Sequence, residues 1–182
     1  LGYLDQSAVL FAKAVAHAET LNFPVVIAFI RWKRALTGVM MEDLELTKKQ
    51  NNALLEIATD KHFAFYEASA LAISGWVEQR QGKPGAIEKA QDGMDQVNSL
   101  GSTAMDSISF TVIMHLYVLL NDRQYDAARK IIDDALPNFE TLGCKWTFPE
   151  FMRLKGVCGL GAKNPNFHEI ESTFLKALKV TR

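Results

Sequence analysis

A spacing of about forty residues between matching apolar positions sets the strongest limit on the fold of this chain. Two columns of residues keep this spacing. They are Leu54, Met94, Leu136 and Leu178, at intervals of 40, 42 and 42 residues, and Ala90, Ile132 and Phe174, at intervals of 42. A repeat of this length is one supersecondary unit, which is too small to bury its apolar face alone. The sequence therefore predicts a solenoid-like array whose units stack into a continuous core.

The apolar pattern and the positions of breaker residues predict nine helices and no strand. Their ranges are 1–21, 24–40, 43–59, 64–81, 85–99, 104–120, 124–141, 148–160 and 167–181. Pro24 and Pro149 fit a first helical turn, where the missing amide would have no partner. We expect one helical-repeat domain over 1–182, in which a lone first helix precedes the pairs 24–59, 64–99, 104–141 and 148–181.

The pattern within the helices predicts which of them lie inside the array. Ile108 to Leu120 and Pro24 to Ile30 are apolar on more than one face, as expected for inner helices packed on both sides. Leu44 to Thr59 and Ala127 to Glu140 are more amphipathic and should lie outside. Pro137 should bend or end its helix early, because it removes a backbone hydrogen bond.

Charge and hydrophobicity exclude several classes of function. Twenty basic and twenty-one acidic residues leave a formal charge of -1, which disfavours binding to nucleic acid or to an anionic membrane. The most apolar run, Ile108 to Leu120, is too short to span a bilayer. The sequence shows no secretion signal, so we expect a cytoplasmic protein. The chain opens on a helical pattern without Met, which predicts a fragment of a longer protein, although a small protein trimmed of a tag fits as well.

No pattern of catalytic or metal-binding residues is found, and no cofactor is predicted. Cys144 and Cys158 lie fourteen residues apart without a histidine at ligand spacing, so we expect two reduced, buried thiols. Residues 156–163 superficially resemble a phosphate loop, but Ala162 stands where that motif needs lysine, and we expect a glycine-rich helix exit. His168 begins like a zinc-protease motif but has Ser172 where the second histidine would stand.

The last repeat carries a resemblance to a known family. Its residues are Arg153-Leu154-Lys155-Gly156 and, after a short loop, Glu171-Ser172-Thr173-Phe174-Leu175-Lys176-Ala177-Leu178-Lys179-Val180-Thr181-Arg182. This stretch resembles the tetratricopeptide-like repeats of large bacterial signalling ATPases, including adenylate-cyclase-linked and LuxR-type transcriptional regulators. The resemblance implies a right-handed superhelix of antiparallel helix pairs that serves as a sensor arm. Two departures are the period, which exceeds 34 residues, and the third first helix, which lacks a clear small residue for close packing.

Three functions remain open at this point. The first is recognition of a protein, peptide or effector on a concave face, through polar residues of the first helices. The candidates are Arg31, Arg34, Glu67, Ser74, His115 and Arg153. For each of them the alternative is a side chain that reaches water or pairs within the array. The second function is self-association as a homodimer through apolar terminal helices, with Leu4 and Phe11 as contacts. The third, a small helical enzyme, lacks a recognisable active site.

Overall fold

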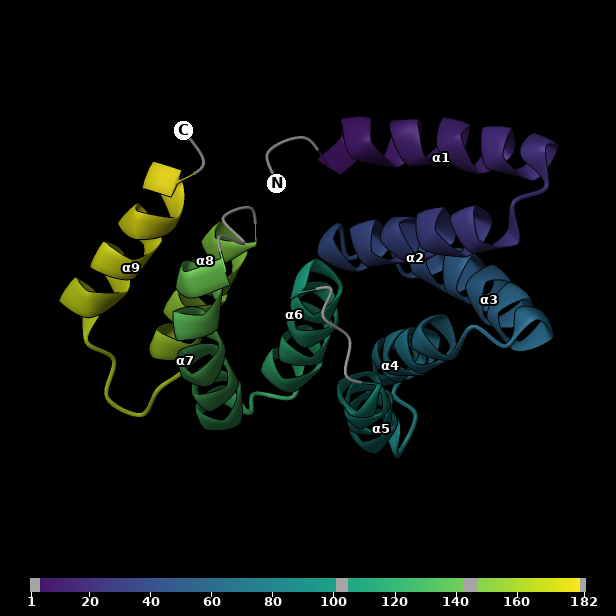
Figure 1. Ribbon diagram of the computed structural model, residues 1–182. Coiled ribbons are helices and arrows are strands. Elements are labelled where there is room, and N and C mark those ends of the chain that lie inside the picture. The colour runs from purple at the N-terminus through teal and green to yellow at the C-terminus, as the bar shows by residue number, and fades with distance from the viewer. Residues whose placement is uncertain (1–3, 101–104, 143–146, 181–182) are drawn as a thin grey trace. The chain divides into compact units, whose positions relative to one another are not determined.

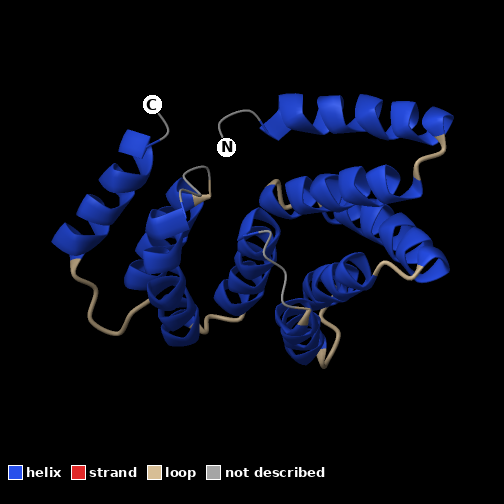
Figure 2. Ribbon diagram, viewed as in Figure 1, coloured by secondary structure: helices blue, strands red, loops and turns tan. Residues whose placement is uncertain are grey.

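The computed structural model describes residues 4–100, 105–142 and 147–180, and in these ranges every regular element is a helix (Figures 1 and 2). The helices are α1 (Leu4–Leu21), α2 (Pro24–Met40), α3 (Leu44–Lys61), α4 (Ala64–Arg80), α5 (Ala86–Ser99), α6 (Met105–Asn121), α7 (Tyr125–Leu142), α8 (Phe148–Leu160) and α9 (Phe167–Val180). The all-α prediction is confirmed. Each described helix matches a predicted range to within two residues, apart from the start of α1, which borders residues outside the described part.

The helix ends follow from their local sequences. Pro24 and Pro149 stand in the first turns of α2 and α8, as predicted. The side chain of Asp43 accepts a hydrogen bond of 2.9 Å from the amide of Leu46, which satisfies a donor that the start of α3 would otherwise leave unpaired. Pro137 lies inside α7, which continues to Leu142, so the expected early end is wrong. Pro137 is exposed, and water can solvate the carbonyl that the proline leaves without a partner.

Short connections reverse the chain through left-handed backbone conformations. In the described part, four of these residues are not glycine: Asn22, Glu42, His62 and Arg123, with φ between 51° and 59°. The connection from α4 to α5 uses glycines instead, at Gly82 with φ 70° and Gly85 with φ 75°. Glycine adopts this conformation without a steric penalty, which suits both positions to a tight turn.

The helices form two compact units, one of α1 to α5 and the other of α6 to α9. In the first unit, α2 packs on α1, α3 and α4, and α4 packs on α3 and α5. In the second unit, α6 packs on α7 and α8, and α8 packs on α7 and α9. Within each unit, the first helix of a pair therefore contacts its own second helix and the first helix of the next pair. Among the described helices, none combines the length and apolar character needed to cross a bilayer.

Small residues let the two helices of a pair approach closely. Ala35, Gly75 and Gly159 stand at equivalent positions in α2, α4 and α8. A Cβ atom on Gly75 would lie 2.6 Å from the carbonyl oxygen of Ala86, and one on Gly159 would lie 2.7 Å from the side chain of Ile170. In α6 this position is occupied by Tyr117, so the departure expected for the third first helix is present.

Candidate functional site

The first turns of α2 expose an apolar surface. Val25, Val26 and Phe29 have exposed fractions of 50%, 42% and 44%. The sequence predicted burial on both sides for this part of α2, and that prediction is wrong. For α6 the same prediction is confirmed, because Ile113 to Leu119 are buried apart from the half-buried Tyr117. We define Val25, Val26 and Phe29 as the α2 surface.

Aromatic rings lie beside and beneath the α2 surface. The ring centroid of Phe29 is 6.2 Å from that of Trp32, which is 1% exposed. Trp32 in turn makes edge-to-face contacts with Phe65 at 5.3 Å and with Tyr66 at 6.2 Å, both in the first turn of α4. The ammonium of Lys33 lies 4.3 Å from the Trp32 ring centroid and 5.6 Å from that of Phe29. The surface thus combines exposed apolar side chains with a rigid aromatic base and one cation.

Two of the predicted recognition residues bind neighbouring helices. Arg31 of α2 forms an ion pair with Glu19 of α1 and donates a hydrogen bond of 3.4 Å to the side-chain oxygen of Gln50 in α3. Ser74 of α4 accepts a hydrogen bond of 2.9 Å from the Asn51 amide of α3 and donates one to the carbonyl of Ala70. Both side chains therefore hold the helices of the first unit together.

Two further candidates, Arg34 and Glu67, lie on α2 and α4 and are half-buried. The Nε atom of Arg34 is buried, and no described residue accepts its hydrogen bond. Glu67 lies in the first turn of α4, where a negative charge interacts favourably with the helix dipole. Neither observation tests whether Arg34 and Glu67 contact a partner, so their role in recognition stays a prediction.

The last two candidates, His115 and Arg153, belong to the second unit. His115 is 4% exposed, so its side chain is not presented to a partner. Arg153 donates from Nε and an Nη atom to the two carboxylate oxygens of Glu150, at 2.9 and 2.7 Å. The hydroxyl of Tyr117 in α6 donates to the same carboxylate at 2.9 Å and accepts from Arg153 at 3.0 Å. Glu150 is buried, and a buried carboxylate requires such partners.

The Tyr117, Glu150 and Arg153 cluster connects α6 to α8. Burial, followed by the negative charge of Glu150, raises the pKa of Tyr117 well above its usual value. Hydrogen bonding to Glu150 raises the pKa of Arg153. Tyr117 therefore stays protonated and Arg153 stays charged at neutral pH, which favours a structural role for the cluster. Sequence reasoning selected Arg153 but could not identify Tyr117, which lies 36 residues earlier in the chain.

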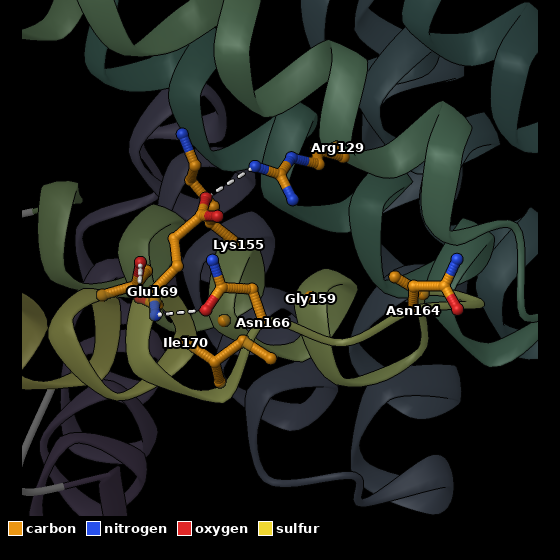
Figure 3. A pocket seen from close by; sticks show the side chains of 10 residues that line it. Arg129, Lys155, Gly159, Asn164, Asn166, Glu169 and Ile170 are labelled. Carbon is orange, nitrogen blue, oxygen red and sulfur yellow. Dashed lines mark hydrogen bonds and ion pairs between the residues drawn. The ribbon is translucent and has the colours of Figure 1, made fainter.

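A small cleft of about 90 Å³ lies where α7, α8 and α9 meet (Figure 3). Arg129 reaches across it from α7 and forms an ion pair of 2.8 Å with Glu169 of α9. Lys155 of α8 forms one of 2.6 Å with Asp133 of α7. The Asn166 side chain accepts a hydrogen bond of 3.3 Å from the Glu169 amide and thereby caps α9. Both cations of the cleft, Arg129 and Lys155, are thus paired with carboxylates of a neighbouring helix.

The glycine-rich stretch beside this cleft ends a helix, as predicted. Gly156 and Gly159 lie inside α8, and Gly161 follows its last residue. A Cβ atom on Gly156 would lie 2.6 Å from the ring of Phe174, so this glycine allows α9 to approach α8. Among the described residues, no three side chains of His, Cys, Asp or Glu are grouped so that they could hold a metal ion.

Cys158 is a free thiol that is 2% exposed, as predicted, whereas Cys144 lies outside the described residues. Burial raises its pKa from 9.0 to about 11. The unfolded thiol therefore ionises first, and the free energy of unfolding should fall by about 2 kcal/mol as the pH rises from about 9 to about 11. Urea unfolding of the wild type and of Cys158→Ala across this range measures the effect. Equal pH dependences of the two proteins would contradict it.

Fold and surface together define an all-helical protein with paired helices and an exposed apolar surface on a first helix. The chain has no match among protein-family models, curated protein sequences or solved structures.

Proposed function

We propose that this chain is a recognition module, a right-handed tetratricopeptide-like α-solenoid segment of a cytoplasmic bacterial signalling or transcriptional regulator, without catalytic activity. The repeated spacing of 40 to 42 residues supports this proposal. So does the packing within each unit, where first helices contact one another as well as their own second helices. Stacking of this kind leaves the remaining face of each first helix available to a partner.

The α2 surface is the observation that carries the proposal. Val25, Val26 and Phe29 lie on adjoining turns of one helix, and all three are more than 40% exposed. Leaving large apolar side chains together in water is unfavourable, and such patches commonly mark protein interaction sites. We therefore place the recognition surface here, because Arg31 and Ser74 are engaged within the first unit.

The surroundings of the α2 surface indicate the chemistry of the partner. The ring of Phe29 lies beside Trp32, which is itself packed against Phe65 of α4, so little entropy is lost when a partner binds. Lys33 provides a positive charge at the edge of the patch. The partner that fits is a peptide segment that places an apolar side chain on Phe29 and a carboxylate near Lys33.

Selection from a phage-displayed library of random peptides tests the proposal. We expect enriched peptides to combine apolar and acidic residues, and we expect Phe29→Ala to weaken their binding by about tenfold or more. Fluorescence anisotropy with the enriched peptides gives the dissociation constants. Leu100→Ala is the matched control, because Leu100 is also an exposed apolar residue, 46% accessible, but lies at the end of α5.

Two results would count against this function. One is a selection that enriches no binding peptide. The other is a set of peptides that bind Phe29→Ala and wild type equally. Circular dichroism of each variant establishes that the helices remain folded, since Phe29 is half exposed and its truncation should cost little stability.

A further inference from the structure

The helix α9 has one covered face and one exposed apolar face. Ile170, Thr173 and Ala177 are buried on the covered side, which packs on α8. On another side, large apolar residues are accessible to water. They are Phe167, Leu175 and Leu178, with exposed fractions of 70%, 58% and 58%. Leucine and phenylalanine at this spacing form a stripe along the helix, which is typical of a contact surface.

The exposed side of α9 forms a shallow, open surface that is made by this helix alone. The lining residues are His168, Glu171, Ser172, Leu175, Lys176 and Lys179. Leu175 stands in the middle of the set. Glu171 precedes it by one helical turn and Lys179 follows it by one turn, so the face is negative before Leu175 and positive after it.

The helix α7 shows what covers the equivalent face one repeat earlier. Forty-two residues before Phe167, Glu171, Leu175 and Leu178 stand Tyr125, Arg129, Asp133 and Leu136. In α7, Arg129 is paired with Glu169 and Asp133 with Lys155. Tyr125 lies against Gly161, where an added Cβ atom would be 2.4 Å from the tyrosine ring. This face of α7 is thus a helix-packing face, whereas its counterpart on α9 leaves Phe167, Leu175 and Leu178 exposed.

We infer that the exposed face of α9 binds the same face of a second copy of this chain, with the two helices antiparallel about a two-fold axis at Leu175. The order of charges supports this occupant. In an antiparallel pair centred on Leu175, Glu171 of each copy faces Lys179 of the other, so both ion pairs form at once. A parallel pair would instead place like charges opposite each other. The inference does not depend on the peptide-binding surface of α2.

The extent of α9 limits the strength of this dimer. Its 14 residues span about 21 Å, so the pair buries less area than a standard stable interface. We expect reversible dimerisation with a dissociation constant on the order of 100 μM. The sequence also predicted self-association through terminal helices, with Leu4 and Phe11 of α1 as contacts. The side chain of Leu4 lies outside the described residues, and Phe11 is half-buried.

Sedimentation equilibrium of the whole chain over a range of concentrations tests the inference. We expect a monomer–dimer equilibrium for the wild type and a monomer throughout for Leu175→Glu, which places two carboxylates together on the axis. Leu160→Glu is the matched control, because Leu160 is 51% exposed on α8 of the same unit and should leave the equilibrium unchanged.

Charge reversal tests the antiparallel geometry itself. Glu171→Lys and Lys179→Glu should each weaken dimerisation by about tenfold, since both ion pairs become repulsive. An equimolar mixture of these two variants should dimerise again, because every contact in the mixed dimer joins opposite charges. A wild-type chain that stays monomeric near 1 mM, a dimer insensitive to Leu175→Glu, or a mixture without rescue would each overturn the inference.

Discussion

Gly93→Ala is expected to lower the free energy of unfolding by about 3 kcal/mol. An added Cβ atom would lie 2.4 Å from the backbone nitrogen of Ala72 and 2.8 Å from the carbonyl oxygen of Ala68. Both atoms belong to the backbone of α4, so no side chain can rotate to make room and the two helices must separate. The better helix propensity of alanine, about 1 kcal/mol, does not offset this strain.

Urea unfolding followed by circular dichroism measures the effect of Gly93→Ala. Asp92→Ala is the control, because Asp92 is the exposed neighbour of Gly93 on the same helix. The control should change stability by about 0.5 kcal/mol or less. If Gly93→Ala proved as stable as the wild type, the close contact between α4 and α5 would not exist as described.

Trp32→Ala is expected to cost about 3 to 5 kcal/mol. The side chain is 1% exposed and supports the rings of Phe65 and Tyr66 in α4, so its removal leaves a cavity between α2 and α4. Trp32→Phe retains an aromatic ring and should lose about half as much. Thermal or chemical unfolding of both variants gives the comparison.

A control for Trp32 is Phe167→Ala, which removes a large aromatic side chain that is 70% exposed. It should change stability by about 0.5 kcal/mol at most. Similar losses for the two positions would show that Trp32 does not hold α2 and α4 together. The tryptophan variants should also weaken binding of the peptides selected on the α2 surface, because Phe29 rests on that ring.

The helices were predictable because their signals are local. Apolar spacing, Pro24 and Pro149 at helix starts, and glycines at 82 and 85 all act within a few residues of the feature they produce. The early end that the sequence allowed at Pro137 is wrong for a different reason, while the alternative, a bend, stays a prediction. Whether a proline ends a helix depends on whether water can reach the carbonyl that loses its partner, and exposure is a property of the fold.

The candidate site was less predictable. A helix start that is apolar on all sides, such as Pro24 to Ile30, has the same pattern whether neighbours cover it or a partner does. Polar residues within apolar helices gave a similar ambiguity. Ser74 and Arg153 were predicted to contact a partner or to pair within the array, and the residues they pair with, Asn51 and Tyr117, lie 23 and 36 residues earlier, beyond any local pattern.

The hydrogen bonds of Asn51 have a consequence for how a repetitive chain finds its native arrangement. Helix pairs with similar apolar faces can dock on the wrong neighbour, or on the right one shifted by a turn. Asn51 donates to the carbonyl of Ala70 at 3.0 Å and to the hydroxyl of Ser74 at 2.9 Å, and a shift of α3 along α4 by one turn would carry the amide away from both acceptors. Any other alignment buries an amide without partners, at a penalty of about 1 to 3 kcal/mol. The side-chain amide of Asn51 thus favours the native pairing and alignment of α3 with α4 over other arrangements.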